Sequence, residues 1–323
     1  MLCEQVLALL EQNRGRIVTG GEIARQLKVS RTAVWKTVAA LREKGHEIES
    51  AQSSGYRLNH ESDGLDLKAI GYGLTTEKLG RSMELLKSVD STNTYLKRKD
   101  ISSLPDGHAV IADGQTGGRG RKGRTFCSPK GNGVYISCLL KPQIPLSETA
   151  FLTICAAVAV CRAVNDVCGI KAEVKWVNDI YLDGKKLCGI LTEAGVNAEM
   201  QCVDYAVVGI GVNTGDIPPE IEHIATSVYE ASGVKGIRNR LAAGILNHFE
   251  QVYLGFIQDG KKQEILDEYT RRLFIIGKTV KVEDTSGGYE AEVLGVDDMG
   301  RLLVKRPDGQ TDALNAGDIS IMP

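Results

Sequence analysis

The chain has 323 residues, of which 42% are hydrophobic, 25% are charged and 5% are aromatic. This length predicts two or three domains, and the composition is that of a soluble globular protein that can bury a sizeable core. The net charge of -2 excludes nucleic-acid binding through overall charge, so any DNA contact must come from a local basic face.

Residues 1–62 show the pattern of a winged helix-turn-helix domain. Apolar periodicity and strand composition predict helices at 2–10, 21–27 and 30–41, and strands at 46–49 and 56–58. Ser30 is a good N-cap for the third helix, and the polar stretch Ser53, Ser54 and Gly55 forms the turn between the strands. Three helices followed by a β-hairpin are typical of this fold.

The third predicted helix carries short and cationic side chains opposite its aliphatic stripe. Residues 1–60 hold nine Lys/Arg and six Asp/Glu, a net charge of +3 that leaves the remainder at -5. Such side chains can reach phosphates and base edges in a major groove. The residues predicted to contact DNA are Ser30 and the outward-facing Arg31, Thr32, Lys36 and Thr37. A helical bundle with a solvated polar face, or a protein-interaction module, is the alternative interpretation.

A polar hinge at 61–66 leads into a central domain, predicted over residues 63–273. A long apolar helix is expected at 147–167, and one or two amphipathic helices at 236–273. The predicted strands lie at 109–112, 134–140, 171–177, 180–182, 185–193 and 206–212. Hairpin-linked strands with helices on one side indicate an α+β domain with a mixed sheet rather than a doubly wound fold.

The last segment, residues 274–323, changes to a purely β pattern. Short strands are predicted at 279–283, 289–296, 301–305 and 311–314, with a turn at Pro307, Asp308 and Gly309. This spacing predicts a small β-barrel of SH3-like type. The whole chain is therefore expected to be an α+β multidomain protein of three parts.

The eight cysteines form no C-x-x-C pair and no Cys/His cluster at zinc spacing, so no protein-bound metal site is predicted. Most of them lie in apolar runs, where Cys acts as a small hydrophobic side chain. The sequence shows no signal peptide and no uninterrupted apolar span. A reduced, cytoplasmic protein without a membrane partner is expected.

The string QTGGRGRKGR, residues 115–124, combines four cations with glycines. Glycine lets backbone N–H groups approach anionic oxygens, and Arg recognises carboxylate or phosphate in a bidentate manner. An RGG-like RNA-binding segment or a solvated linker are the alternatives. The string lies between two predicted strands, which favours a loop that folds over a small acid and a nucleotide.

This string resembles the biotin loop of the biotin–protein ligases in their bifunctional, biotin-repressor form. Further similarities follow in the family's order along nearly the whole chain: Ser91-Thr92-Asn93, Lys175-Trp176-Val177-Asn178-Asp179, Lys186-Leu187-Cys188-Gly189-Ile190-Leu191 and Gly209-Ile210-Gly211-Val212-Asn213. Each motif is weak or moderate alone, but five in order are highly specific. Val177 stands where the family usually has Pro, and Phe126 where many members have Trp.

The resemblance implies a role for each matching position. The residues implied to hold the ureido head of biotin are Ser91, Thr92, Asn93 and Gln115. Those implied to close over the ligand are Arg119, Gly120 and Arg121, with Arg121 facing phosphate. Lys186 would contact the biotin carboxylate and the α-phosphate, and Asp179 would be the base for the incoming lysine. Lys186, Arg121 and Asp179 are thus the predicted catalytic residues.

The chemistry requires these residue types independently of the resemblance. Attack of a carboxylate on the α-phosphorus of ATP brings two anions together, which fixed cations stabilise. Mg²⁺ bound mainly to the phosphates is the usual helper, and a carboxylate can deprotonate the acceptor lysine. The implied partners are a biotin carboxyl carrier protein of acetyl-CoA or pyruvate carboxylase, operator DNA and a second copy of the chain. Biotinyl-5'-AMP would act as corepressor.

Other interpretations remain open from the residues alone. Ser91-Thr92-Asn93 could be a helix N-cap, Lys186 could be merely exposed, and Asn178-Asp179 could be turn residues. A ligand-sensing transcriptional repressor without ligase activity is the alternative function. A lipoate or octanoate ligase is a third, although the polar set around Gln115 suits a ureido ring better than an aliphatic tail. The stretch after Asn213 does not identify a residue that covers the adenine.

Overall fold

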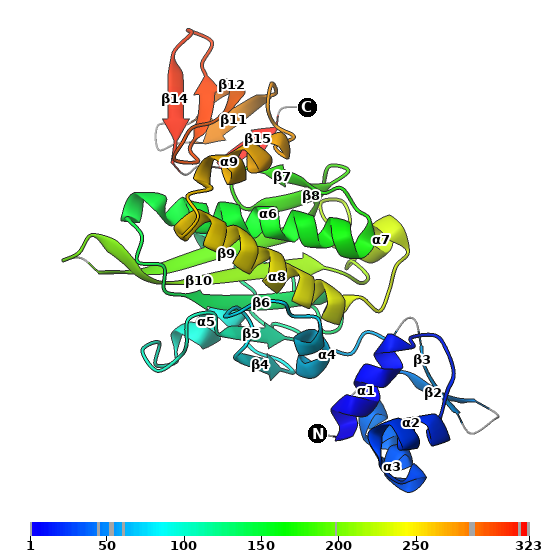
Figure 1. Ribbon diagram of the computed structural model, residues 1–323. Helices are drawn as coiled ribbons and strands as arrows, with labels where there is room; N and C mark the ends of the chain where they lie inside the picture. Colours follow the sequence, from blue (N-terminus) through cyan, green and yellow to red (C-terminus); the bar gives the residue numbers. More distant parts are fainter. Residues whose placement is uncertain are drawn as a thin grey trace.

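The computed structural model describes residues 2–43, 46–51, 55–59, 62–197, 199–283, 288–315 and 318–321. These residues form three separate sheets, of three, seven and five strands. Figure 1 shows a small helical head that contains the N-terminus, a large central sheet covered by long helices, and a small β domain at the opposite end. Ser53, Ser54 and Glu61, which belong to the predicted turn and hinge, lie outside the described residues.

The head is a winged helix-turn-helix, as predicted. Its elements are α1 (Leu2–Gln12), β1 (Val18–Thr19), α2 (Gly20–Leu27), α3 (Arg31–Glu43), β2 (Ile48–Ala51) and β3 (Gly55–Leu58), with strand order β1-β3-β2. Thr19 and Glu22 form a capping box that starts α2. The Ser30 hydroxyl accepts the N–H of Ala33 at 3.1 Å and caps α3. Apolar side chains of all three helices share one core.

The central domain is built on a mixed seven-stranded sheet. Its strands are β4 (Met83–Leu86), β5 (Ala109–Ala112), β6 (Gly133–Leu140), β7 (Glu173–Lys175), β8 (Asp179–Leu182), β9 (Lys185–Asn197) and β10 (Cys202–Asn213), in the order β4-β5-β6-β10-β9-β8-β7. Among the described strands of this sheet, β4 and β5 pair in parallel and the other pairs are antiparallel, so the predicted mixed sheet is confirmed. The strand predicted at 171–177 is shorter, and β4 was not predicted.

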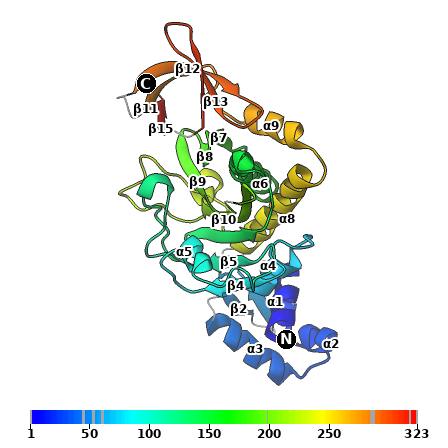
Figure 2. The same cartoon turned by 90° about the vertical axis from the view of Figure 1, so that its left-hand side faces the viewer.

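Helices cover the two faces of this sheet unequally. They are α4 (Leu67–Tyr72), α5 (Thr92–Lys97), α6 (Thr149–Cys168), α7 (Val228–Ser232), α8 (Arg238–Ile257) and α9 (Lys262–Arg271), with short 3-10 turns η1 (Arg121–Gly123) and η2 (Leu146–Glu148). Figure 2 shows α6 and α8 stacked on one side of the strands and α5 on the other. A small cluster of Leu96, Val110, Leu139 and Val207 packs beneath α5.

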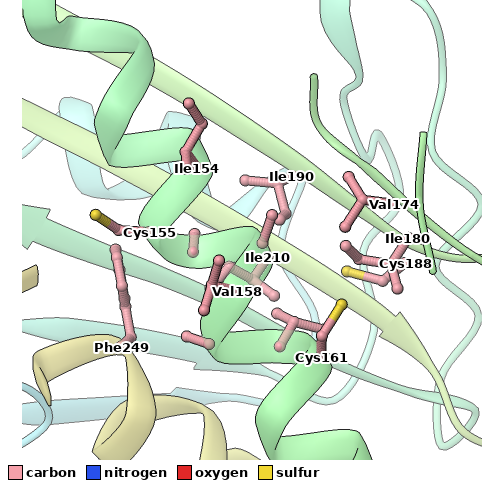
Figure 3. Packing of buried hydrophobic residues seen from close by; sticks show 14 of the residues in the cluster. Ile154, Cys155, Val158, Cys161, Val174, Ile180, Cys188, Ile190, Ile210 and Phe249 are labelled. Carbon is pink, nitrogen blue, oxygen red and sulfur yellow. The ribbon is translucent and has the colours of Figure 1, made fainter. Parts of the chain in front are cut away.

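Helix α6 forms the centre of the main core. Its side chains contact sheet residues such as Ile190 and Ile210 on one side and Phe249 of α8 on another (Figure 3). Each fully buried aliphatic side chain of this kind contributes roughly 1.5–3 kcal/mol. The segment Leu146–Cys168 is long and apolar enough to cross a membrane, but most of it is buried inside the protein, as in the core helix of a globular domain.

The C-terminal domain is a small antiparallel β structure. Its strands are β11 (Thr279–Glu283), β12 (Tyr289–Val296), β13 (Leu302–Lys305), β14 (Thr311–Leu314) and β15 (Asp318–Ile321), in the order β14-β13-β12-β11-β15. The four predicted strands are confirmed, and β15 was not predicted. The indole N–H of Trp176 donates to the Gly300 carbonyl at 3.1 Å and links this domain to the central one. The Trp176–Val177 peptide bond is cis.

Candidate functional site

A pocket of about 160 Å³ opens between the start of α5, residues 115–124 and strands β8, β9 and β10. Residues 115–124 are called the glycine–arginine loop below. The pocket is lined by all nine residues predicted to bind ligand or to act in catalysis: Ser91, Thr92, Asn93, Gln115, Arg119, Gly120, Arg121, Asp179 and Lys186. The fold therefore brings together side chains that lie almost a hundred positions apart in sequence.

One end of the pocket is a network of uncharged polar groups at the start of α5. Ser91 caps this helix, with its hydroxyl 3.5 Å from the N–H of Thr94, so the N-cap interpretation is also correct. The Gln115 carbonyl oxygen accepts from the backbone N–H of Thr92 at 2.8 Å and from its hydroxyl at 3.1 Å. The Gln115 amide in turn donates to Ser128 Oγ at 2.9 Å. These bonds fix hydroxyl and amide groups at the pocket wall.

Asn93 lies deeper in the same network. Its amide donates to the Leu191 carbonyl at 3.1 Å and to the Glu193 carboxylate at 3.0 Å, and Ser137 Oγ lies 2.6 Å from its Oδ1. A side chain at Gly209 would clash with Asn93 Oδ1. Glycine is thus required at this position of β10 so that the amide can pack against the strand.

Gly211, the next glycine along β10, also leaves room for a neighbouring side chain. A Cβ at Gly211 would lie 2.5 Å from the ring of Phe126, which follows the glycine–arginine loop. The Phe126 ring also rests near Gly189 on β9. The two glycines of the Gly-x-Gly-x-Asn string therefore leave room on β10 for the side chains of Asn93 and Phe126, and they do not form a phosphate-binding turn.

The opposite end of the pocket is charged. Lys186 Nζ lies 2.7 Å from Asp179 Oδ1, with Lys186 on β9 and Asp179 on the neighbouring β8. The Arg121 guanidinium donates to Asn178 Oδ1 at 3.2 Å, and the Asn178 amide donates to the Ile190 carbonyl at 2.9 Å. Arg121 and Lys186 thus approach from opposite sides, one from the loop and one from the sheet.

The glycine–arginine loop folds back on itself. The Gly120 N–H donates to the Arg124 carbonyl at 2.7 Å, and the Phe126 N–H donates to the Gly118 carbonyl at 2.9 Å. Arg119 Nη1 lies 3.4 Å from Glu193 Oε1. The first two bonds fix the shape of the loop, and the Arg119–Glu193 contact joins it to β9. Arg119, Arg121 and Arg124 of the loop line the pocket.

Glu193 of β9 is a residue that the sequence analysis missed. Its carboxylate contacts Asn93, Lys97 of α5 and Arg119 of the loop, with Lys97 Nζ at 2.6 Å. Burial opposes ionisation of Glu193, but the hydrogen bonds from Lys97 and Asn93 outweigh it and lower its pKa. It thus links the polar end of the pocket to the loop. Glu193 belongs to no motif, so the sequence alone did not distinguish it from an exposed strand residue.

A second cavity of about 380 Å³ adjoins the pocket and shares Arg121, Asn178 and Ile190 with it. It is bounded by α6 on one side and by residues 299–301 and Asn315 of the C-terminal domain on the other. Ile319 of β15 also reaches the first pocket. The C-terminal domain therefore forms part of the site's surroundings.

Asp179 is the only carboxylate among the described residues that line the pocket. Within the described ranges, no group of three or more His, Cys, Asp or Glu side chains could hold a metal ion. Because Asp179 is already paired with Lys186, the pocket offers cations for anionic oxygens and no ready-made cage for a divalent cation.

The outer face of α3 differs in one respect from the prediction. Ser30, Arg31, Thr32 and Lys36 are exposed, but Thr37 is only 6% exposed, so the expectation that it faces outward is wrong. Thr37 lies three residues after Val34 and four before Leu41, on the same buried stripe. Trp35, which the sequence analysis did not select, is 61% exposed among the polar side chains.

Three segments match known families. Residues 3–57 match the HTH domain, residues 85–213 the Biotin/lipoate A/B protein ligase family, and residues 275–322 the Biotin protein ligase C terminal domain. The matched segments follow the three parts of the fold in order.

Relatives match over nearly the full length. The Bifunctional ligase/repressor BirA of Bacillus spizizenii is 36% identical, with 95% of each chain covered. The Biotin--[acetyl-CoA-carboxylase] ligase of Mycobacterium tuberculosis is 29% identical over 74% of this chain and 88% of its own. The structure of the biotin protein ligase from Aquifex aeolicus in complex with biotin and ATP is 29% identical, with a TM-score of 0.64, and covers 75% of this chain and 99% of that one. The pocket, the winged head and these likenesses agree, and the chain belongs to the family of bifunctional biotin protein ligases and repressors.

Proposed function

We propose that this protein joins biotin to a lysine of a carrier protein through biotinyl-5'-AMP, and uses the same adenylate as corepressor of biotin genes. The observation that carries the proposal is the pocket itself. Hydroxyl and amide groups gather at one end, and the cations Arg121 and Lys186 meet at the other. A small acid with a polar head and an activated carboxylate fits this division of charge.

The polar end would bind the ureido head of biotin. A ureido group has one carbonyl acceptor and two N–H donors, so it needs hydroxyl or amide partners of both kinds. Ser91, Thr92, Asn93 and Gln115 supply them, and the bonds among these side chains set their directions before ligand arrives. Arg119, Gly120 and Arg121 would then cover the bound ligand.

The first chemical step would take place at the charged end. A carboxylate oxygen of biotin attacks the α-phosphorus of ATP, the bond to the leaving oxygen breaks, and pyrophosphate departs. Lys186 and Arg121 would stabilise the negative charge that builds on the phosphoryl oxygens. The Asp179 carboxylate at 2.7 Å holds the Lys186 ammonium in place for that contact.

The second step would transfer the acyl group. The amine of the carrier lysine attacks the mixed anhydride carbon, AMP leaves, and the amine loses a proton. Asp179 is the only described carboxylate that lines the pocket, which makes it the candidate acceptor of that proton. Mg²⁺ would neutralise charge on ATP and be held mainly by the phosphates, since Asp179 is the one acidic side chain among the described residues that line the pocket. The carrier would be the biotin carboxyl carrier protein of acetyl-CoA or pyruvate carboxylase.

The head would place α3 in the major groove of operator DNA. Exposed Arg31, Thr32 and Lys36, with Ser30 at the N-terminus of α3, suit contacts with phosphates and base edges. A homodimer would present two heads to a palindromic operator. The protein would act in the cytoplasm. The domain limits 1–62, 63–273 and 274–323 are part of this proposal and are supported by the three separate sheets.

Pyrophosphate release separates the candidate functions. With ATP and Mg²⁺, we expect biotin to give pyrophosphate, and lipoate or octanoate to give little. No release with any acid would favour a repressor without ligase activity, and preferred release with lipoate would favour the lipoate ligase. Deletion of residues 1–62 should abolish binding to a DNA fragment from a biotin-gene promoter but spare pyrophosphate release. An inactive, folded truncation would contradict the separation of the two functions.

A further inference from the structure

Arg238, the first residue of α8, is 2% exposed and has the largest fully buried side chain among the residues that the structure describes. Burying a guanidinium costs free energy unless its N–H groups have acceptors. Nothing in the proposed chemistry uses this residue. Its acceptors show what it holds together.

Two of these acceptors are the two ends of the segment that contains the glycine–arginine loop. Arg238 Nη2 donates to Asp113 Oδ1 at 2.8 Å, and Asp113 is the first residue after β5. Arg238 Nε donates to the carbonyl of Gly133, the first residue of β6, also at 2.8 Å. The segment that contains the loop leaves the sheet at Asp113 and returns to it at Gly133, and the Arg238 guanidinium binds both of these ends. The Gly131 N–H donates to the Asp113 carbonyl at 3.0 Å and keeps these ends together.

The third acceptor is the linker to the winged head. Arg238 Nη1 donates to the Asp63 carbonyl at 3.1 Å, and the backbone N–H of Arg238 donates to Asp63 Oδ1 at 2.8 Å. A carboxylate at the N-terminus of a helix is favourable for the helix dipole. The next residue, Asn239, continues the contact, because its amide donates to the Gly64 carbonyl at 2.9 Å.

The residue before Asp63 is linked to the head instead. The guanidinium of Arg14, two residues after α1, donates to the Ser62 carbonyl at 2.8 Å. The Ser62 hydroxyl accepts the N–H of Glu47, which precedes β2, at 2.9 Å. Ser62 is therefore hydrogen-bonded to the head, and the next residue, Asp63, to the central domain.

We infer that Arg238 is a positioning residue that couples closure of the glycine–arginine loop to the orientation of the winged head. The inference rests on the proposed function, because it names the path by which a ligand at the pocket changes the head. Gln115, which contacts Thr92 in the pocket, is only two residues from Asp113. A ligand that draws the loop inward moves Asp113 and Gly133, and the shared guanidinium transmits that movement to Asp63. By reciprocity, a constrained head changes the affinity of the pocket by the same factor.

Amide hydrogen exchange of the full chain tests this coupling. The wild type and Arg238→Gln are compared with and without saturating biotin, ATP and Mg²⁺, using peptides from the loop, 113–133, and the linker, 62–72. In the wild type we expect ligand to slow exchange in both peptides, by on the order of 10-fold in the linker. In Arg238→Gln the loop should remain protected while protection of the linker falls below about 2-fold.

A matched control is Arg162→Gln. Arg162 forms an ion pair with Glu268 in the same domain, far in sequence from both the loop and the linker, and this variant should respond as the wild type does. If Arg238→Gln does not fold, Arg238→Lys decides in the same way, because one ammonium cannot serve three separated acceptors.

The outcomes separate this inference from the proposed function. Linker protection that persists in a folded Arg238 variant, or that never appears in the wild type, would overturn the coupling. Loss of loop protection in the same variants would show that Arg238 only builds the pocket, and would overturn it too. A wild-type loop that ligand does not protect at all would instead count against the proposed function.

Discussion

Replacing Lys186 by Ala tests the charged end of the pocket most sharply. The Lys186 side chain is 31% exposed, and its ammonium lies 2.7 Å from the Asp179 carboxylate. Its removal takes away one cation and also leaves the Asp179 carboxylate unbalanced, facing the anions that must react. Two unit charges about 4 Å apart interact by roughly 4 kcal/mol at an effective dielectric constant of about 20. A loss of about 10²–10³ in the rate of adenylate formation is expected, as for removal of one preorganised donor.

The assay is pyrophosphate release in a single turnover with biotin, ATP and Mg²⁺, without carrier. Lys262→Ala is the matched control, because Lys262 is 30% exposed and pairs with Glu148 at 2.8 Å outside the pocket. The double variant Lys186→Ala/Asp179→Asn removes the unbalanced charge. It should recover part of the rate but stay at least about 10-fold below the wild type. A single variant within about 3-fold of the wild type, or full recovery in the double variant, would refute a direct role of Lys186.

Three further changes follow from the geometry. Arg121→Gly removes the loop's contact with Asn178 and should release the adenylate early, seen by mass spectrometry as biotin on bystander lysines; tight retention would contradict the closing role. Gly209→Ala forces its Cβ against Asn93 and should weaken biotin binding by about 1–3 kcal/mol in calorimetry, whereas Gly244→Ala on α8, where a Cβ meets only ordinary contacts, should not. Burial opposes ionisation of Glu268, but hydrogen bonds from Arg162 and Arg272 outweigh it and lower its pKa from 4.5 to about 2. Because this pKa is depressed, the ionised carboxylate stabilises the folded state fully above about pH 5, and this stabilisation, up to about 3 kcal/mol, is lost as the pH falls toward 2. The melting temperature of Glu268→Gln should therefore fall less steeply over this acid limb, from about pH 5 to about pH 2, than that of the wild type. An unchanged acid limb in that variant would contradict the assignment.

The pattern of hydrophobic residues and turns was sufficient for most of the fold. Asp183 and Gly184 have positive φ angles of 49° and 78°, as a two-residue hairpin turn requires, and they join β8 to β9 where predicted. The strands that flank the glycine–arginine loop were also found, because alternation and apolar runs are local signals. Strands β4 and β15 were missed, since each is four residues long and is defined by pairing with a strand distant in sequence.

The site was predictable only where residues form motifs. The glycine–arginine loop and Lys186 were recognised as parts of strings, whereas Glu193 and Arg238 are single residues whose partners come from other segments. No local pattern distinguishes such residues from ordinary surface charges. Thr37 is the opposite case, because its spacing from Val34 and Leu41 placed it on the buried stripe and its polar character was given too much weight.

Transfer of label from biotin to a carrier tests the central claim most directly. The full chain is incubated with labelled biotin, ATP, Mg²⁺ and a biotin carboxyl carrier domain, and the labelled site is mapped by mass spectrometry. Label on one carrier lysine, dependent on ATP and lost in Lys186→Ala, is the predicted result. A folded protein that binds biotin but leaves both the carrier and the nucleotide unchanged would contradict it.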